Sequence, residues 1–289
     1  MKKVIFCDLD NTLLFPLENQ TYGIKEVDLK ALQKALQDDV QLVIASGRPA
    51  EIKESISNMI GLEVDAIGLN GQQIICNGVN TILASFPVKD YLKITDDILH
   101  RFSSTNAGTV GLDGCYYTND CSQPQPLARF VHHYECGIIK DICKINAHEA
   151  FKERNIEHVA KLLIYIDENT DDQPILHHLN TTYGKNYSFI RSNHMFIEGL
   201  CKGHSKRTGI EKYMEMNQLT FDQCYCAGDA DNDIEMFEFL QDHSYCMKAG
   251  TKNARNTAKH LVENLAEMID IITKGLTPTG GDPVNDATR

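Results

Sequence analysis

The stretch that decides the fold is Val4–Leu14, which reads VIFCDLDNTLL. Its first four residues form a short apolar run, which is typical of a strand buried on both faces of a parallel sheet. Two carboxylates, Asp8 and Asp10, follow at the end of this run. Because a carboxylate is costly to remove from water, such a pair at the end of a buried strand predicts that something neutralises its charge there.

Composition and charge narrow the class of protein. The chain has 289 residues, of which 42% are hydrophobic, and this is long enough for one large domain or two ordinary ones. Its formal net charge of −12 argues against nucleic acid or an anionic membrane as the main partner. No apolar stretch reaches the length of a membrane span, and the N-terminus becomes acidic too early for a signal peptide. We therefore expect a soluble, cytoplasmic protein that binds a small molecule; its oligomeric state is left open.

Apolar runs alternate with helical patterns at both ends of the chain. The runs KKVIFC and QLVIASGR are each followed by a segment with apolar residues at helical spacing, Val27–Leu36 and Ala50–Met59. The same rhythm returns late in the chain, with a helical pattern over Ser205–Asn217, the run CYCAG, and a further apolar run at Ser244–Met247. This alternation predicts an α/β fold: a Rossmann-like parallel sheet with helices on both faces.

The middle of the chain has a different character. It contains short strand candidates and two amphipathic helical stretches, Lys89–Phe102 and Asp172–Tyr183, which predict a small α+β domain inserted into the first. The expected boundaries are 1–82 and 190–275 for the discontinuous core, 83–189 for the inserted cap domain and 276–289 for a tail. The tail is rich in Gly, Pro and Asp, and this composition predicts disorder.

Three further motifs lie at predicted strand ends or helix starts. SGR (Ser46–Arg48) follows a strand, GHSK (Gly203–Lys206) opens a helix, and GDADND (Gly228–Asp233) lies between a strand and a helix. The carboxyl ends of parallel strands share one edge of a sheet, and ligands bind in the crevice there. We therefore expect these motifs to meet the first one at a single site. Asn70–Gly71 is typical of a hairpin turn near that site.

The chemistry of the four motifs is complementary. The carboxylates supply oxygen ligands that suit a hard cation such as Mg²⁺, and they are Asp8, Asp10, Asp229 and Asp233. Ser46 and Lys206 supply a hydroxyl and a cation near a helix start, which suits a phosphate, and Asn232 adds an amide donor. Dense negative charge offset by a metal and a lysine is what phosphoryl transfer requires. Asp231 is expected to be a turn residue without a catalytic role.

DLDNTLL, SGR, GHSK and GDADNDIEMF together resemble the four motifs of the haloacid dehalogenase-like hydrolases. More narrowly, they resemble the Cof-type phosphatases, which carry a large α/β cap between the second and third motifs. The likeness covers about residues 1–80 and 190–265, and the insert has the length and position of that cap. One departure is Asn11, which stands where the family usually has glycine. The resemblance implies a Mg²⁺-dependent phosphatase that acts on small phosphate monoesters, with sugar phosphates favoured.

The resemblance also implies roles for the aspartates. Asp8 would be the nucleophile that attacks phosphorus and forms an aspartyl-phosphate. Asp10 would protonate the leaving oxygen and then activate water for hydrolysis of this intermediate. Mg²⁺ would be held by the Asp8 carboxylate, the Asp10 backbone carbonyl and Asp229. Asp233 would complete this site by orienting Lys206 or a metal-bound water.

The phosphate-binding residues follow from the same resemblance. Ser46 and the catalytic Lys206 would bind the transferring phosphoryl group, with Arg48 and Asn232 close by. Lys202 is a second candidate for the lysine, because it is also followed by glycine.

Two other functions are open at this point. A sugar phosphomutase of the same superfamily shares the first two aspartates but passes the phosphate to a second sugar hydroxyl instead of to water. A non-hydrolytic phosphate-binding or signalling protein, such as a bacterial receiver domain, also gathers acids, a hydroxyl and a lysine at a sheet edge. Receiver domains are much shorter, and their acceptor aspartate does not lie two residues before a second acid on the first strand.

Overall fold

The computed structural model describes residues 2–16, 22–102, 105–112, 115–119, 141–142, 146–166, 170–193 and 196–275, with the backbone alone for 141, 142, 192 and 193. The predicted disordered tail lies outside the described residues. The chain divides into two compact units, one formed by 1–81 together with 205–289 and the other by 82–204.

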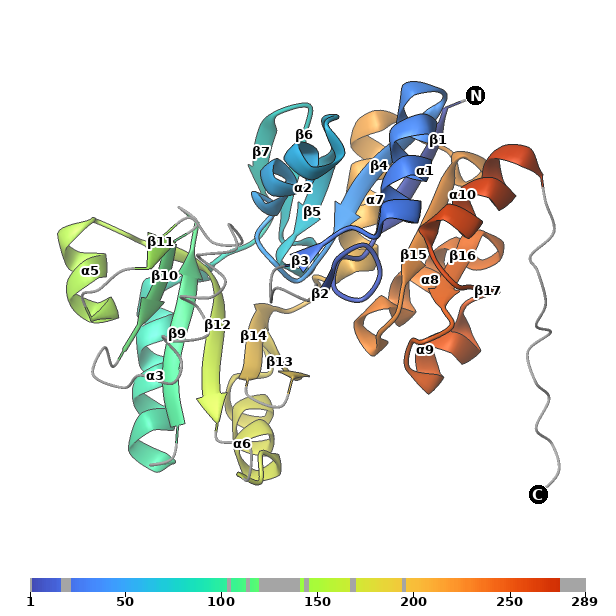
Figure 1. Ribbon diagram of the computed structural model, residues 1–289. Coiled ribbons are helices and arrows are strands. Elements are labelled where there is room, and N and C mark those ends of the chain that lie inside the picture. Colours follow the sequence, from blue (N-terminus) through green and yellow to red (C-terminus); the bar gives the residue numbers. More distant parts are fainter. Residues whose placement is uncertain are drawn as a thin grey trace, which may run out of the picture. The chain divides into compact units, whose positions relative to one another are not determined.

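The first unit is built on an eight-stranded sheet (Figure 1). In order across the sheet its strands are β17 (His260–Val262), β16 (Ser244–Met247), β15 (Cys224–Gly228), β1 (Lys3–Cys7), β4 (Val40–Ala45), β5 (Asp65–Gly68), β6 (Gln73–Cys76) and β7 (Val79–Ile82). All pairs from β17 to β5 are parallel, and β6 pairs antiparallel with β5. The apolar run of Val4–Cys7 lies at the centre of this sheet and is buried, as its lack of polar side chains predicts.

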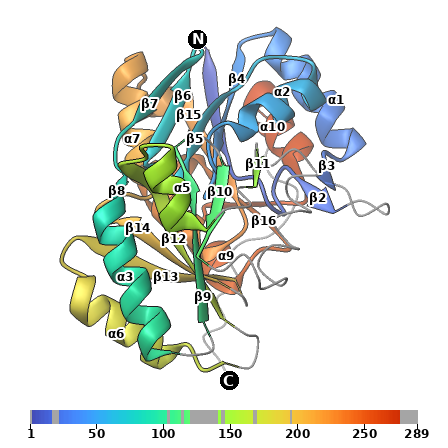
Figure 2. The ribbon, with the colours of Figure 1, turned by 90° about the vertical axis from the view of Figure 1, so that its left-hand side faces the viewer.

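Helices cover both faces of this sheet. The long ones are α1 (Glu26–Gln37), α2 (Ile52–Ile60), α7 (Lys206–Asn217), α8 (Ile234–Leu240) and α10 (Leu265–Lys274). Figure 2 shows α7 on one side of the sheet and α1, α2 and α10 on the other. The strand order reverses direction at β1, because β4 and β15 flank it on opposite sides. Right-handed crossovers therefore place α1 and α2, which follow β1 and β4, on the face opposite α8, which follows β15, whereas the C-terminal α10 packs against α1. The ends of β1, β4 and β15 meet at this switch point, which is where open α/β sheets bind ligands.

Short elements complete the first unit. They are β2 (Phe15–Pro16), β3 (Tyr22–Gly23), α9 (Lys252–Thr257) and four 3₁₀ turns, η1 (Leu69–Gly71), η2 (Phe221–Gln223), η3 (Asp231–Asp233) and η4 (Gln241–His243). The turn η1 follows β5 directly, and η3 follows β15 after Asp229 and Ala230, so both turns lie at the edge of the sheet where the strands end.

The second unit has its own mostly antiparallel sheet. Its strands are β11 (Asp141–Ile142), β10 (Cys115–Thr118), β9 (Thr105–Gly111), β12 (His158–Ile166), β14 (Phe196–Cys201) and β13 (Tyr187–Asn193) in order, with β8 (Phe86–Pro87) paired to β12. Helices α3 (Val88–Arg101), α5 (Ala147–Glu153) and α6 (Gln173–Tyr183) pack against it. Their apolar residues and one face of the sheet form a continuous core that includes Tyr91, Phe151, Leu162 and Leu179.

The α/β prediction, with a parallel sheet covered on both faces and an inserted α+β unit, is confirmed. The observed boundary after the insert differs from the expected one at residue 189. Strand β13 spans Tyr187–Asn193 and pairs with β14, and β14 pairs with β12, so both strands belong to the sheet of the second unit. The second unit therefore continues to His204, and the first resumes at Ser205, immediately before α7.

Candidate active site

Parallel strand ends bring three of the predicted residues to one edge of the sheet. Asp8, Ser46 and Asp229 each follow the last residue of a strand, β1, β4 or β15. The register aligns these ends, because Cys7 lies opposite both Ile44 of β4 and Ala227 of β15. The backbone N–H of Asp8 donates to the carbonyl of Ala227 at 2.9 Å, which extends the pairing up to the carboxylate itself.

Lys206 enters this edge from the first turn of α7. Ser205 caps the helix by accepting from the N–H of Thr208, so the lysine occupies the first helical position. Its ammonium donates to Asp8 Oδ1 at 2.6 Å and to Asp233 Oδ1 at 2.5 Å, and the whole side chain is buried. A buried ammonium is stable only when paired in this way. The carboxylates of Asp233 and Asp8 accordingly raise the pKa of Lys206 above its ordinary value, although burial lowers it.

Asp233 organises the loop around the lysine. While Oδ1 accepts from Lys206, Oδ2 accepts from the backbone N–H groups of Asp229 and Ala230, both at 2.9 Å. Gly228 makes room for it, because a Cβ at that position would lie 2.5 Å from the Asp233 carboxylate. These contacts place Asp233 as a positioning residue for both Lys206 and the Asp229 loop.

Three carboxylates form a cluster that can hold a cation. Asp8, Asp229 and Asp233 each offer an oxygen within 4.8 Å of the other two. Asp229 is further held by Thr12, whose hydroxyl donates to its Oδ1 at 3.2 Å. Among the described residues, Lys206 is the one buried cation paired with these three acids, so the cluster carries excess negative charge. Its all-oxygen donor set fits Mg²⁺, which prefers a few carboxylates and completes its coordination with phosphate and water.

The titration behaviour reflects this excess. Burial raises the pKa of the Asp8 carboxyl to about 8; Lys206 opposes the rise and Asp233 adds to it. Burial and the neighbouring Asp233 also raise the pKa of Asp229, to about 6. A nearby positive charge favours the charged form of a carboxyl. A dication bound at the cluster would therefore lower the raised pKa values of Asp8 and Asp229 and stabilise their ionised forms.

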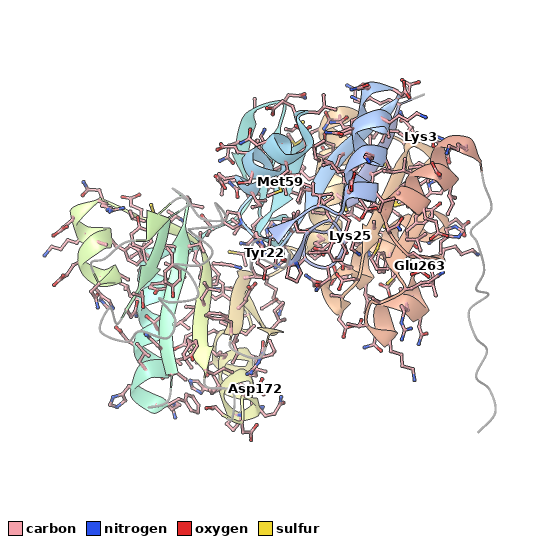
Figure 3. All side chains as sticks on the ribbon, viewed as in Figure 1. Lys3, Tyr22, Lys25, Met59, Asp172 and Glu263 are labelled. Atoms are coloured by element: carbon pink, nitrogen blue, oxygen red, sulfur yellow. The ribbon has the colours of Figure 1, made fainter. Side chains whose placement is uncertain are left out.

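Asp10 and Arg48 form a separate pair beside the cluster. Arg48 Nε donates to Asp10 Oδ2 at 3.0 Å and its Nη2 to Asp10 Oδ1, a bidentate contact. The guanidinium also lies 5.7 Å from the ring centroid of Tyr22, a residue labelled in Figure 3. Arg48 was expected beside the phosphate; the structure instead places two of its nitrogens on Asp10. The third, Nη1, is buried and has no hydrogen-bond partner within the described ranges.

The remaining predicted residues occupy distinct places. The Ser46 side chain is buried and its Oγ accepts from the N–H of Arg48 at 3.2 Å. Asn232 lies in η3 with its side chain exposed. Asp231 accepts from Thr251 and Asn253, which ties η3 to α9. Lys202 donates to the carbonyl of Gly184 in the second unit, so of the two candidate lysines it is Lys206 that lies at the aspartates.

The sequence reasoning missed Thr12 as a partner of Asp229 and gave no structural reason for Asn11. The backbone of Asn11 has φ = 64°, in the left-handed region that glycine and asparagine tolerate best. This explains how asparagine replaces the usual glycine there. Thr12 is the last residue of the DNT triplet, but the sequence alone does not show which carboxylate its hydroxyl contacts.

Comparison with known proteins identifies the family to which this chain belongs. The family model of haloacid dehalogenase-like hydrolases matches residues 5–269, so the chain belongs to this family. A protein of Streptococcus pyogenes serotype M6 that carries the name "putative phosphatase" is 23% identical over 91% of this chain and 93% of its own length. A protein of Buchnera aphidicola with the same name is 24% identical over 94% of this chain and 98% of its own length.

Solved structures share the fold. A haloacid dehalogenase-like hydrolase from Bacteroides thetaiotaomicron matches with a TM-score of 0.78 at 20% identity, covering 94% of this chain and all (100%) of that one. A putative HAD/COF-like hydrolase from Plasmodium vivax matches with a TM-score of 0.76 at 17% identity, covering 95% of this chain and 96% of that one.

Within the described part of the chain, no helix combines the length and apolar character needed to cross a membrane.

Proposed function

We propose that this hydrolase is a Mg²⁺-dependent phosphatase that cleaves small phosphate monoesters through an aspartyl-phosphate on Asp8. The observation that carries the proposal is the contact of Lys206 with both Asp8 and Asp233, inside a cluster of three carboxylates at the end of β1. The ammonium of Lys206, together with a dication that the acidic cluster would bind, favours a dianionic phosphate as the substrate. Sugar phosphates are the favoured esters by resemblance to the Cof-type phosphatases.

In the first step Asp8 attacks the phosphorus atom through one carboxylate oxygen. An Asp8–phosphorus bond forms, the bond from phosphorus to the ester oxygen breaks, and the departing oxygen takes a proton from Asp10. Lys206 and the Ser46 hydroxyl bind the phosphoryl oxygens and neutralise charge as the group moves. The contact of Asp233 with Lys206 keeps the ammonium in place during transfer.

In the second step a water molecule attacks the phosphorus of the aspartyl-phosphate. Asp10 takes a proton from this water, the bond to Asp8 breaks, and inorganic phosphate leaves. Asp10 thus ends each cycle protonated, as it began: its first proton leaves with the ester oxygen and the second comes from water. Arg48 holds the Asp10 carboxylate by two hydrogen bonds, which orients it for both transfers.

The carboxylates of Asp8 and Asp229 would hold Mg²⁺, and Asp233 lies close enough to contribute. When bound, Mg²⁺ would shield the repulsion between Asp8 and the incoming phosphate.

The proposal is tested by release of p-nitrophenol from p-nitrophenyl phosphate, with Mg²⁺ or with EDTA. We expect turnover with Mg²⁺, none with EDTA, and none in Asp8→Asn. A panel of phosphorylated sugars, assayed for free phosphate, extends the test to natural esters. Absence of phosphate release from every ester would refute the proposal. If a phosphosugar isomer appears in place of free phosphate, the protein is a phosphomutase.

A further inference from the structure

The start of α9 lies against the loop that carries Asp229. The backbone N–H of Thr251, the residue that caps α9, donates to the carbonyl oxygen of Asp229 at 2.7 Å. Gly250 permits this approach, because a Cβ at that position would lie 2.6 Å from the same carbonyl oxygen. Any side chain at position 250 would therefore force the two segments apart.

The side chain of Thr251 makes a second contact with the same loop. Its hydroxyl donates to Asp231 Oδ1 at 2.5 Å, and Asn253 Nδ2 donates to Asp231 Oδ2 at 3.2 Å. Both carboxylate oxygens of Asp231 thus accept from residues at the start of α9. Asp231 accordingly does not belong to the three-carboxylate cluster described above, although it lies in the same acidic motif.

The hydroxyl of Thr251 has two partners at once. It gives its hydrogen to Asp231 and accepts from the N–H of Ala254 at 3.3 Å, which is the capping contact of α9. Thr251 therefore holds the loop at two points, with its backbone at Asp229 and with its side chain at Asp231. Both points depend on the position of one helix start.

These contacts determine where the Asp229 carboxylate points. The N–H of Asp229 donates to Asp233 and its carbonyl accepts from Thr251, so the peptide groups on both sides of its Cα are fixed. The direction of the Cα–Cβ bond follows from these two peptide groups. A carboxylate that is oriented before a cation arrives binds it more tightly, and the partners of ligating residues commonly set metal affinity in this way.

We propose that Thr251 and Asp231 are positioning residues for the cation: their contact orients Asp229 and thereby sets the affinity of the acidic cluster for Mg²⁺. This inference rests on the proposed function, because it takes Asp229 as a ligand of Mg²⁺. It assigns to Asp231 the role of a hydrogen-bond acceptor for the start of α9, without contact with the metal.

The test is a calorimetric titration of the metal-free protein with Mg²⁺, which involves no substrate. Thr251→Val removes the hydroxyl at unchanged charge, and we expect the Kd for Mg²⁺ to rise about three- to tenfold. Thr251→Ser keeps the hydroxyl and should bind Mg²⁺ as the wild type does. Asp231→Ala should weaken binding as Thr251→Val does, whereas Asp231→Asn keeps an acceptor for the hydroxyl and should bind Mg²⁺ more tightly than Asp231→Ala.

Asn264→Ala is the matched control, because Asn264 caps α10 by accepting from the N–H of Glu267, just as Thr251 caps α9. Asn264→Ala and Thr251→Val each lose a helix cap, so urea unfolding should show a comparable loss of stability in both. Asn264→Ala should nevertheless keep the wild-type Kd for Mg²⁺. An equal rise of Kd in the two variants would mean that Thr251 acts only through stability, and the inference would be wrong.

Two further results would overturn the inference. One is a Thr251→Val variant that binds Mg²⁺ as tightly as the wild type. The other is an equal loss of affinity in Asp231→Asn and Asp231→Ala, because Asp231 would then act through its charge. If the wild type binds Mg²⁺ but hydrolyses no ester, the proposed function fails alone and the Kd values still decide the inference. If the wild type binds no Mg²⁺, the metal dependence in the proposed function fails and the inference fails with it.

Discussion

Buried carboxylates lie at the start of one strand and just beyond the ends of others in the same sheet, and their surroundings differ. At the start of β5, the two oxygens of Asp65 accept from Tyr213 at 2.5 Å, from Gln41 at 3.0 Å and from the N–H of Asn77 at 2.9 Å. All these donors are neutral, and they satisfy a single acid. At the other end, where β1 and β15 finish, three acids share one lysine. A buried carboxylate whose hydrogen bonds are all made, such as Asp65, stabilises the fold. A cluster with more carboxylates than cations can instead bind a positively charged ligand.

The largest effect should come from removing one charge at each end. Asp8→Asn should lower kcat/KM at least about a thousandfold, because the amide is no nucleophile. Its fold should persist, since the amide oxygen still accepts from Lys206. Asp65→Asn should do the reverse, lowering stability while activity per folded molecule stays at the wild-type level. Steady-state kinetics measure the activity of both variants, and urea unfolding measures their stability. If Asp65→Asn is fully folded and still loses activity, the prediction is wrong.

The second largest effect should be the loss of stability in Lys206→Met. It leaves Asp8 and Asp233 buried without their cation, and breaking a buried pair in this way costs about 3–5 kcal/mol. Urea unfolding without metal measures the loss. Lys202→Met is the control, because that side chain is exposed and donates to the carbonyl of Gly184, away from the aspartates; we expect a change within about 0.5 kcal/mol. Equal effects of the two substitutions would be incompatible with the site described.

The pH dependence of metal binding sharpens the comparison further. The pKa values of Asp8 and Asp229 are raised to about 8 and about 6. The folded state therefore binds more protons than the unfolded chain between about pH 4 and pH 8, and metal-free stability should fall as pH rises through this window. Mg²⁺ needs the ionised forms, so its stabilisation should grow over the same range, reaching about 2.7 kcal/mol at a hundredfold excess over Kd.

Thermal unfolding at pH 6 and pH 8, with Mg²⁺ and with EDTA, tests this directly. A Mg²⁺-induced rise in Tm that is larger at pH 6 than at pH 8 would show that the cluster does not bind the metal. In Asp8→Asn the rise should be smaller at both pH values, because one ligand carboxylate has lost its charge.

The smallest effect belongs to Tyr213→Phe. Removing this hydroxyl takes one donor from Asp65 and one acceptor from Gln41, and it should cost about 1–2 kcal/mol of unfolding free energy. Activity of the folded protein should not change, because the hydroxyl that is removed contacts Asp65 and Gln41 and neither Asp8 nor Lys206. A lower m-value in urea together with altered kcat would mean that the two ends are coupled.

The fold was largely predictable because strand burial and helix periodicity are local properties. Strand ends alone placed Asp8, Ser46 and Asp229 at one edge, since parallel strands align their carboxyl termini. The cap boundary was missed because a local pattern does not show which sheet a strand joins. β14 pairs with β12, which is a long-range contact, and β13 pairs with β14.

Side-chain partners were less predictable than side-chain positions. Arg48 was expected close to the phosphate from the family resemblance, but its bidentate contact to Asp10 joins two loops that are far apart in the sequence. The buried amide of Asn70 was similarly hidden, because an Asn-Gly pair predicts a turn without saying where the asparagine side chain points. In the structure the Asn70 amide lies against Gly47, and its Oδ1 has no hydrogen-bond partner among the described residues.

The order of strands also has a consequence for biosynthesis. Central strand β1 is made first, yet one of its two neighbours, β15, begins at Cys224, after the whole of the second unit. On the ribosome the second unit is complete before the first can close its sheet, and domains generally fold as units as they emerge. The pairing of β1 with β15 spans most of the chain and is therefore slow to form. Until it forms, Asp8 lacks both Lys206 and Asp229, so the candidate site is not assembled before β15 has been made.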